Sequence, residues 1–85
     1  MDSLARLDGL LAERGMSLFA LSRASGIRYS TFDSARRRNG QLSIDTIERI
    51  CDALQIPLYE FFMTDEDWNR IETYALIKNR HRQGA

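Results

Sequence analysis

The chain has 85 residues, 44% of them hydrophobic, with 12 basic and 12 acidic side chains and no formal net charge at pH 7. This length and composition predict one small globular domain and exclude a disordered polar chain. No apolar run reaches the roughly 18 residues that a membrane span needs. The first ten residues, MDSLARLDGL, lack the basic start and long apolar core of a signal peptide, so we expect a cytoplasmic protein without a membrane partner.

A single cysteine, Cys51, and a single histidine, His81, exclude an internal disulfide and a structural zinc site. Cys51 lies at helical spacing among apolar residues and is expected to be buried. There is no Ser/His/Asp set, metal-ligand cluster or phosphate-binding glycine loop, so neither an enzyme nor a cofactor is expected.

The charges are unevenly distributed along the chain. Residues 28–43 carry four basic side chains and one acidic one, residues 44–67 carry one basic and seven acidic, and residues 68–85 carry four basic and one acidic. Because the local field steers an anionic partner, a neutral total is compatible with a basic binding face.

Apolar spacing predicts short helices separated by turns, with no alternating strand pattern. A first helix is expected over residues 3–14, and Gly15 follows as its stop signal. Its apolar face consists of Leu4, Leu7, Leu10 and Leu11. Ser17 can cap a second helix over 18–24, with Leu21 facing inward.

Gly26 can take the positive φ of a tight turn, with Ile27 as the apolar residue behind it. A third helix follows from Arg28 or Tyr29 to Arg36, with Phe32 and Ala35 on its inner face.

Ser43 is the expected cap of a fourth helix, and Asp45 suits its positive end. The apolar stripe of that helix is Ile44, Ile47, Ile50, Cys51 and Leu54. Pro57 opens a fifth helix with apolar residues Leu58, Phe61 and Phe62.

Thr64 and Asp67 resemble a capping box that starts a sixth helix reaching to about Arg82. Its apolar side comprises Trp68, Ile71 and Ala75, with Tyr74, Leu76 and Ile77 as further candidates. The sequence thus predicts an all-α domain of five helices with an additional C-terminal helix.

Two short helices joined by a glycine turn, with polar residues at the start of the second, suggest a helix-turn-helix. The second helix of such a motif enters the DNA major groove, so its outer N-terminal residues must reach base edges. The candidates for base contact are Arg28, Tyr29, Ser30 and Ser34. Arg36, Arg37 and Arg38 at the far end can meet phosphates.

The segments MSLFALSRASGIRYSTFDSARRR and SIDTIERICDALQIPLYEFF resemble the phage repressor, Cro and XRE-like helix-turn-helix family of DNA-binding transcriptional regulators. The resemblance runs from about Leu7 to Phe62 and implies a lambda-repressor-like fold. Its core and turn positions are held by Leu21, Gly26, Ile27 and Phe32.

The resemblance assigns roles residue by residue. Tyr29, Ser30 and Ser34 match positions that usually read bases, and Arg28 matches the start of the recognition helix, which touches bases or phosphate. Apart from the resemblance, Asp33 could accept from a cytosine amino group or a neighbouring arginine. The resemblance places Asn39, Gln41 and Ser43 where phosphate is usually held. The full set of expected phosphate contacts adds residues not assigned by the resemblance and comprises Ser17, Thr31, Arg36, Arg37, Arg38, Asn39, Gln41 and Ser43.

Three departures from the family pattern stand out. Leu18 replaces a glutamine that binds phosphate in many members. Leu11 and Arg36 replace an arginine–glutamate pair, so no single charge is left buried and Arg36 could be released toward DNA. Arg38 replaces a glycine after the third helix, which predicts a differently shaped loop.

The apolar residues Leu11, Leu18 and Phe19 stand where the family is often polar and need cover. We expect the sixth helix to pack on its own domain or on a second subunit. Residues 1–63 are then the DNA-binding domain, and residues 64–85 form a C-terminal helix and tail within the same unit or as a dimerisation element.

The leading interpretation is a sequence-specific regulator that binds double-stranded DNA, acting as a repressor on a palindromic operator as a homodimer. The alternative is a protein-interaction module of the same fold, antitoxin-like or phage-type, whose acidic stretch 44–67 meets a protein partner.

Overall fold

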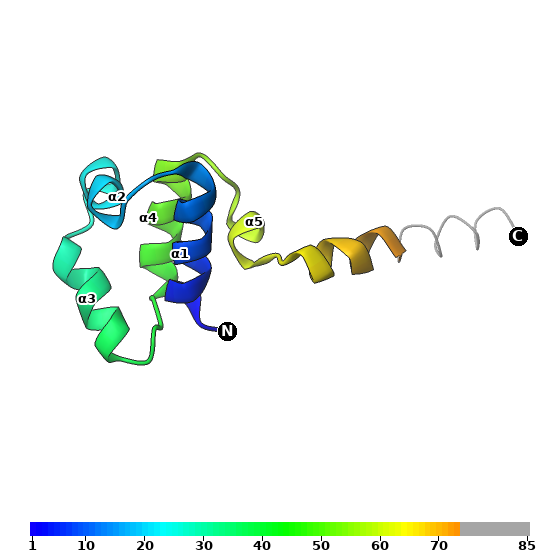
Figure 1. Ribbon diagram of the computed structural model, residues 1–85, viewed down its shortest axis with the longest axis horizontal. Helices are drawn as coiled ribbons and strands as arrows, with labels where there is room; N and C mark the ends of the chain where they lie inside the picture. Colours follow the sequence, from blue (N-terminus) through cyan, green and yellow to red (C-terminus); the bar gives the residue numbers. More distant parts are fainter. Residues whose placement is uncertain (74–85) are drawn as a thin grey trace, which may run out of the picture.

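The computed structural model describes residues 1–73. Its helices are α1 (Ser3–Arg14), α2 (Leu18–Ser25), α3 (Tyr29–Arg37), α4 (Ile44–Leu54) and α5 (Leu58–Phe62) (Figure 1). Residues 65–73 are also helical, and no strand occurs in the part of the chain that is described. The predicted all-α class is confirmed. Within residues 1–73, none of the helices has the length and apolar character required to cross a membrane.

The first three helices begin and end within one residue of their predicted bounds. The Ser17 and Ser43 hydroxyls cap α2 and α4, each accepting a hydrogen bond from the backbone N–H three residues on, at 3.0 and 3.2 Å. Gly15 and Gly26 end α1 and α2 in the left-handed conformation, with φ of 63° and 73°. Pro57 stands at the cap position just before α5.

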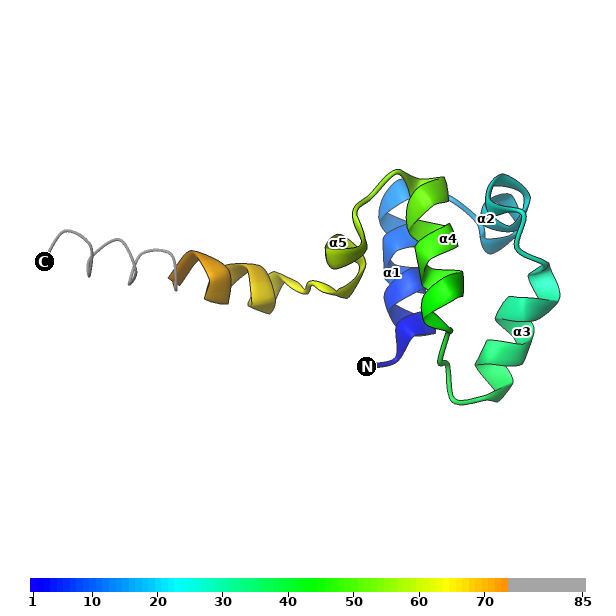
Figure 2. The ribbon, with the colours of Figure 1, turned by 180° about the vertical axis from the view of Figure 1, so that it is seen from behind.

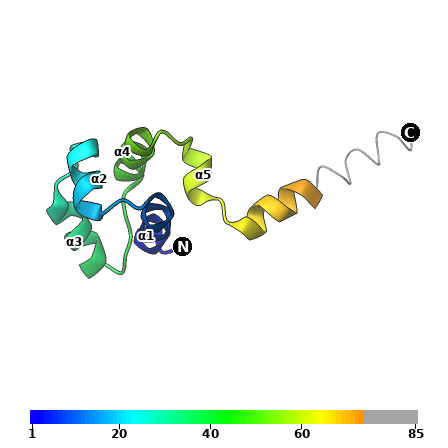
Figure 3. The ribbon, with the colours of Figure 1, turned by 45° about the horizontal axis from the view of Figure 1, so that its top comes forward.

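The core forms where α1 packs on α3 and α5, α4 packs on α2 and α5, and α2 packs on α3. Figures 1 and 3 show α2 and α3 on one side of this body and α5 on the other. The buried apolar residues are Leu4, Leu7, Leu10, Leu11, Leu21, Ile27, Phe32, Ala35, Ile47, Ile50, Cys51, Leu54, Ile56 and Phe61. Burial, reinforced by nearby carboxylates, raises the pKa of the Cys51 thiol, which therefore stays protonated as a small apolar group.

Three expectations about the apolar residues need correction. Ile44 is 55% exposed because it is the first residue of α4, ahead of the buried positions of the stripe. Leu11 and Leu18 need no external cover, since Leu11 is buried and Leu18 packs against the core. Of the three unusual apolar residues, Phe19 alone is exposed.

The capping box at residues 64–67 is confirmed. The Asp67 carboxylate accepts from the Thr64 backbone N–H at 3.0 Å, and the Thr64 hydroxyl accepts from the Asp67 N–H at 3.2 Å. The hydrogen bonds from Thr64 lower the pKa of Asp67.

The helix that follows leads away from the body on the side opposite α3 (Figure 2). Trp68 and Ile71, on the expected apolar side of this helix, are 39% and 46% exposed, so they are not buried in the core of the single chain. Trp68 makes an edge-to-face contact with Tyr59 at 6.0 Å between ring centroids. The proposed contributions of Tyr74, Ala75, Leu76 and Ile77, and the helix end near Arg82, lie outside the described residues.

Arg6 joins α1 to α5. Its guanidinium donates to the backbone carbonyls of Glu60, Phe61 and Met63, at 3.0, 2.7 and 2.9 Å. The last carbonyls of a helix have no partner inside it, and a cation there interacts favourably with the helix dipole. These three bonds from Arg6 hold the short helix α5 against α1.

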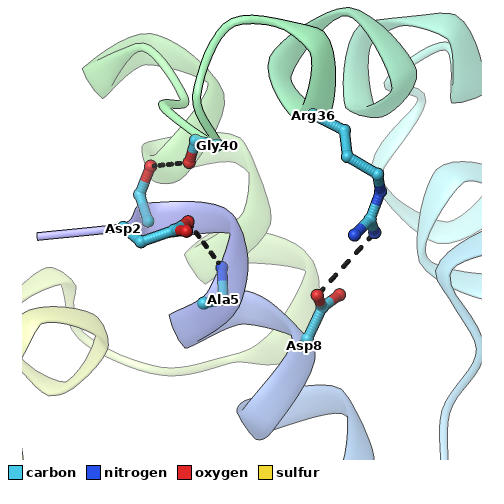
Figure 4. Close-up of polar contacts among 6 residues, drawn as sticks. Asp2, Ala5, Asp8, Arg36 and Gly40 are labelled. Carbon is cyan, nitrogen blue, oxygen red and sulfur yellow. Dashed lines mark hydrogen bonds and ion pairs between the residues drawn. The ribbon is translucent and has the colours of Figure 1, made fainter.

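A second set of bonds joins the start of α1 to the loop between α3 and α4. The Gly40 carbonyl accepts from the Leu4 N–H at 2.9 Å and from the Ser3 hydroxyl at 3.2 Å. The Ser3 hydroxyl in turn accepts from the Leu42 N–H at 2.7 Å, and the Gly40 N–H donates to the Ala35 carbonyl at 2.8 Å. Figure 4 shows the Gly40 carbonyl at the start of α1. The end of α3 is thus bound to a second helix.

Gly40→Ala is expected to destabilise the protein by about 1–3 kcal/mol. Gly40 has φ of 76°, and an added Cβ would clash with the carboxylate of Asp2. Asp2 caps α1 by accepting from the Ala5 N–H at 2.9 Å, so moving its side chain would weaken that cap. Urea denaturation measures the free energy of unfolding.

Gly9→Ala is the matched control. Gly9 lies inside α1 without a positive φ, and a Cβ there would meet nothing within 4 Å. Alanine favours the helix, so this variant should gain up to about 1 kcal/mol. Equal stability of the two variants would contradict the role given to Gly40.

Candidate nucleic-acid interface

The turn between α2 and α3 is held by serine hydroxyls. Ser22 donates to the Ile27 carbonyl, and Ser25 donates to the Leu21 carbonyl at 2.7 Å. The Ile27 N–H donates back to the Ser25 hydroxyl at 3.2 Å. Together with buried Ile27, these bonds fix the direction in which α3 leaves the turn. The sequence pattern identified the glycine and the isoleucine here but not the serines.

α3 has one buried face and one exposed face. Phe32 and Ala35 are buried, at 0% and 1% exposure. The four predicted base-contacting side chains are all exposed: Arg28, Tyr29, Ser30 and Ser34. They occupy the residue before α3 and its first two turns, at the outer edge of the body (Figure 1). Asp33 is exposed among them. The structure therefore brings this predicted set together on one accessible helix.

The predicted phosphate contacts Arg36, Arg37 and Arg38 are exposed at the end of α3. The Arg38 Nε donates to the Ser34 carbonyl at 3.3 Å, across the last turn. Arg38 has φ of −102°, and the left-handed conformations of this loop fall at Asn39 and Gly40 instead, with φ of 63° and 76°. The residues with positive φ are thus Asn39 and Gly40, and not Arg38, which stands where the resemblance implies a glycine.

Arg36 turns toward α1. Its guanidinium lies 3.7 Å from the Asp8 carboxylate, with the two side chains 58% and 47% exposed (Figure 4). Leu11, which replaces the arginine of the family's usual pair, is buried. Where the resemblance implied a charged pair, this chain therefore has a buried apolar residue, Leu11, and a surface ion pair made by Arg36. Exposed pairs of this kind contribute about 0–1 kcal/mol, so Arg36 can leave Asp8 at little cost.

Three of the remaining phosphate candidates lie in the connection between α3 and α4. Gln41 already donates its amide to the Met1 carbonyl at 2.6 Å. The Ser43 hydroxyl, besides capping α4, donates to the Thr46 hydroxyl at 2.8 Å. Asn39 is exposed in the loop.

Thr31 and Ser17 complete the phosphate candidates. Thr31 is half-buried on α3, whereas Ser17 is exposed at the start of α2. The Ser17 oxygen is used for capping, and its hydroxyl proton can still be donated.

The sequence interpretation missed one neighbour of these residues. Phe19, on α2, is 60% exposed and lies beside Tyr29, with 6.3 Å between the ring centroids. An apolar residue at the second position of a helix gives no signal for this contact, because the approach of α2 to α3 depends on the turn between them.

Charge divides the surface. The exposed residues of α4 include Asp45, Glu48 and Asp52 with one basic residue, Arg49. The four basic residues of the segment 28–43 stand at the two ends of α3. Two helices joined by a glycine turn, with the second presenting polar and basic side chains to solvent, define a helix-turn-helix.

Comparison with family models confirms and specifies this class. Residues 6–67 match the Cro/C1-type HTH DNA-binding domain. The chain belongs to this family, and its predicted resemblance is confirmed over most of its length. No curated protein and no solved structure gives a significant match. The protein thus contains a DNA-binding domain, and residues 68–85 lie beyond the matched region.

Asp8→Asn is expected to raise the affinity for duplex DNA about two- to fivefold at low salt, because it removes the carboxylate that partly neutralises Arg36. The free energy of unfolding should change by no more than about 0.5 kcal/mol. Asp52→Asn, on α4, makes the same change in net charge as a control. Equal effects of the two variants on binding would show that Asp8 acts only through total charge.

Proposed function

We propose that the protein is a sequence-specific transcriptional regulator, a repressor that occupies a palindromic operator as a homodimer with α3 in the major groove. The observation that carries this proposal is the exposure of Arg28, Tyr29, Ser30 and Ser34 on a helix whose opposite face is buried in the domain. In helix-turn-helix proteins the N-terminal residues of the second helix contact base edges.

The side chains proposed to contact bases differ in what they can read. Arg28 can donate two hydrogen bonds to guanine, whereas Ser30 and Ser34 can donate to or accept from several bases. Tyr29 offers a hydroxyl on an aromatic ring. Sequence preference would therefore depend mainly on Arg28 and Tyr29, with the serines refining it.

The arginines at the end of α3 are proposed to fix the helix on the DNA backbone through phosphate contacts. Ser17, Thr31, Asn39, Gln41 and Ser43 would add neutral donors around them. Of this set, Ser43 must give up its bond to the Thr46 hydroxyl to donate to a phosphate, and Arg36 must leave Asp8. Gln41 donates to the Met1 carbonyl with one of its two amide hydrogens. The contacts described for Arg37 and Arg38 include none with another helix that would have to break first.

The C-terminal segment is proposed to hold the dimer together, with residues 1–63 as the DNA-binding domain and 64–85 as the dimerisation element. Tyr59, Trp68 and Ile71 expose apolar surface at and after α5, at 60%, 39% and 46%. This surface lies on the side of the body opposite α3, so a second subunit can bind there without covering the recognition helix (Figures 1 and 2).

A protein partner is a second candidate function. The exposed carboxylates of α4, Asp45, Glu48 and Asp52, stand one turn apart along the helix and could meet a basic protein. Binding of such a partner with absent or salt-insensitive binding to DNA would favour this alternative.

Selection of bound sites from a random DNA pool, followed by a salt titration, tests the regulator. We expect an inverted-repeat site whose affinity falls steeply with salt. Tyr29→Ala should relax the preference at one position of each half-site. Arg37→Gln should weaken binding to all sequences and lower the salt slope by about one per subunit. Arg14→Gln, an equal charge change at the exposed end of α1, is the control and should alter neither the base preference nor the salt slope.

If no sequence were enriched and the affinity did not change with salt, the protein would not be an operator-binding regulator. An enriched site without inverted symmetry would retain the DNA-binding function and exclude the symmetric dimer.

The double variant Trp68→Ala, Ile71→Ala is expected to convert the dimer to a monomer while the domain keeps its melting temperature, because both side chains are exposed in the single chain. Sedimentation equilibrium measures the mass. Ile44→Ala removes an exposed isoleucine of α4 and serves as the control. Unchanged mass of the double variant would contradict a dimer formed through this segment.

A further inference from the structure

Two aromatic rings meet beside the proposed base-contacting residues. Phe19 belongs to α2 and is 60% exposed; Tyr29 is the first residue of α3 and is 44% exposed. Their ring centroids are 6.3 Å apart, and the ring planes are inclined at 51°. This tilted contact leaves much of both rings accessible at the end of α3 that carries Arg28 and Ser30.

The position of Phe19 is fixed by its neighbours along α2. Leu18 packs against the core, so the next residue points away from it. Ser22, one turn further on, lies on the same side of the helix as Phe19 and donates a hydrogen bond to the Ile27 carbonyl. This side of α2 therefore faces the start of α3, which explains why the Phe19 ring meets Tyr29.

The pair adds a chemical property that the rest of the proposed interface lacks. Arginine and serine side chains there donate or accept hydrogen bonds, whereas Phe19 has only an apolar surface to offer. Base edges in the major groove present one apolar group, the 5-methyl group of thymine, at the rim of the groove next to the backbone. The first helix of a helix-turn-helix crosses the backbone while the second enters the groove, so a side chain between the two lies at that rim.

We propose that the Phe19 and Tyr29 rings form an apolar contact for the 5-methyl group of one thymine in each operator half-site. This inference rests on the proposed function and adds a specificity-determining residue, Phe19, from outside the recognition helix. The half-site must then contain a thymine at a fixed position, next to the bases contacted from the start of α3.

Replacement of single thymines by deoxyuridine in the selected operator tests the proposal, because it removes only the methyl group. Dissociation constants are measured by fluorescence anisotropy for the wild-type protein and for Phe19→Ala. The wild type should lose roughly three- to tenfold in affinity at one symmetric position, as expected when a buried methyl contact is lost. Phe19→Ala should bind the thymine and uracil duplexes equally.

Two further variants test whether the preference for thymine depends on the apolar character of Phe19 and on the ring of Tyr29. Phe19→Met keeps an apolar side chain and should retain part of the preference for thymine. Tyr29→Phe keeps the ring and should retain most of it. Unchanged melting temperatures would show that the exposed Phe19 is not needed for folding.

The proposal is overturned if no thymine position responds, or if Phe19→Ala keeps the full preference for thymine. It is also overturned if Phe19→Ala weakens every duplex equally, since that result assigns the ring to the sugar-phosphate backbone. In each of these cases the protein still binds its operator, so the proposed function stands. If the wild-type protein bound none of the selected duplexes, both the thymine contact and the proposed function would be excluded.

Discussion

Burial of the Phe32 side chain determines how α3 lies on the domain. The phenyl ring is fully buried, and Ala35 is buried one turn further along the same face. A helix of nine residues is not stable alone in water, so α3 depends on this attachment. With 3.6 residues per turn, the burial of these two positions directs Ser30 and Ser34 outward, while Tyr29 lies at the border of the buried face and is 44% exposed. The face available to DNA is thus a consequence of the face that is anchored.

Both ends of α3 are restrained by hydrogen bonds as well. The serine hydroxyls of the turn fix its start, and the bonds of the Gly40 carbonyl to Leu4 and Ser3 fix the loop at its end. Side chains that read bases must be held on rigid elements to discriminate between them. The neutral chain has a basic end on this helix because most of its acidic residues, eight of twelve, lie on α4 and beyond.

Sequence patterns predicted the elements whose cause is local. Helix spacing, the Ser17 and Ser43 caps and the Gly15 and Gly26 turns are confirmed, as is the family. Contacts that depend on tertiary packing were not predicted: the Arg6 bonds to α5, the Asp8–Arg36 pair and the Phe19–Tyr29 contact join residues on different helices. Trp68 and Ile71 have the spacing of a core helix, but spacing cannot tell whether the surface they cover belongs to the same chain.

The most direct test of the account is to follow the backbone amide signals of isotope-labelled protein by NMR during titration with the selected duplex. Placement of α3 in the major groove predicts the largest shifts at residues 17–19 and 28–43, with small changes over the acidic face of α4. The largest shifts on α4, with α3 unaffected, would contradict the account.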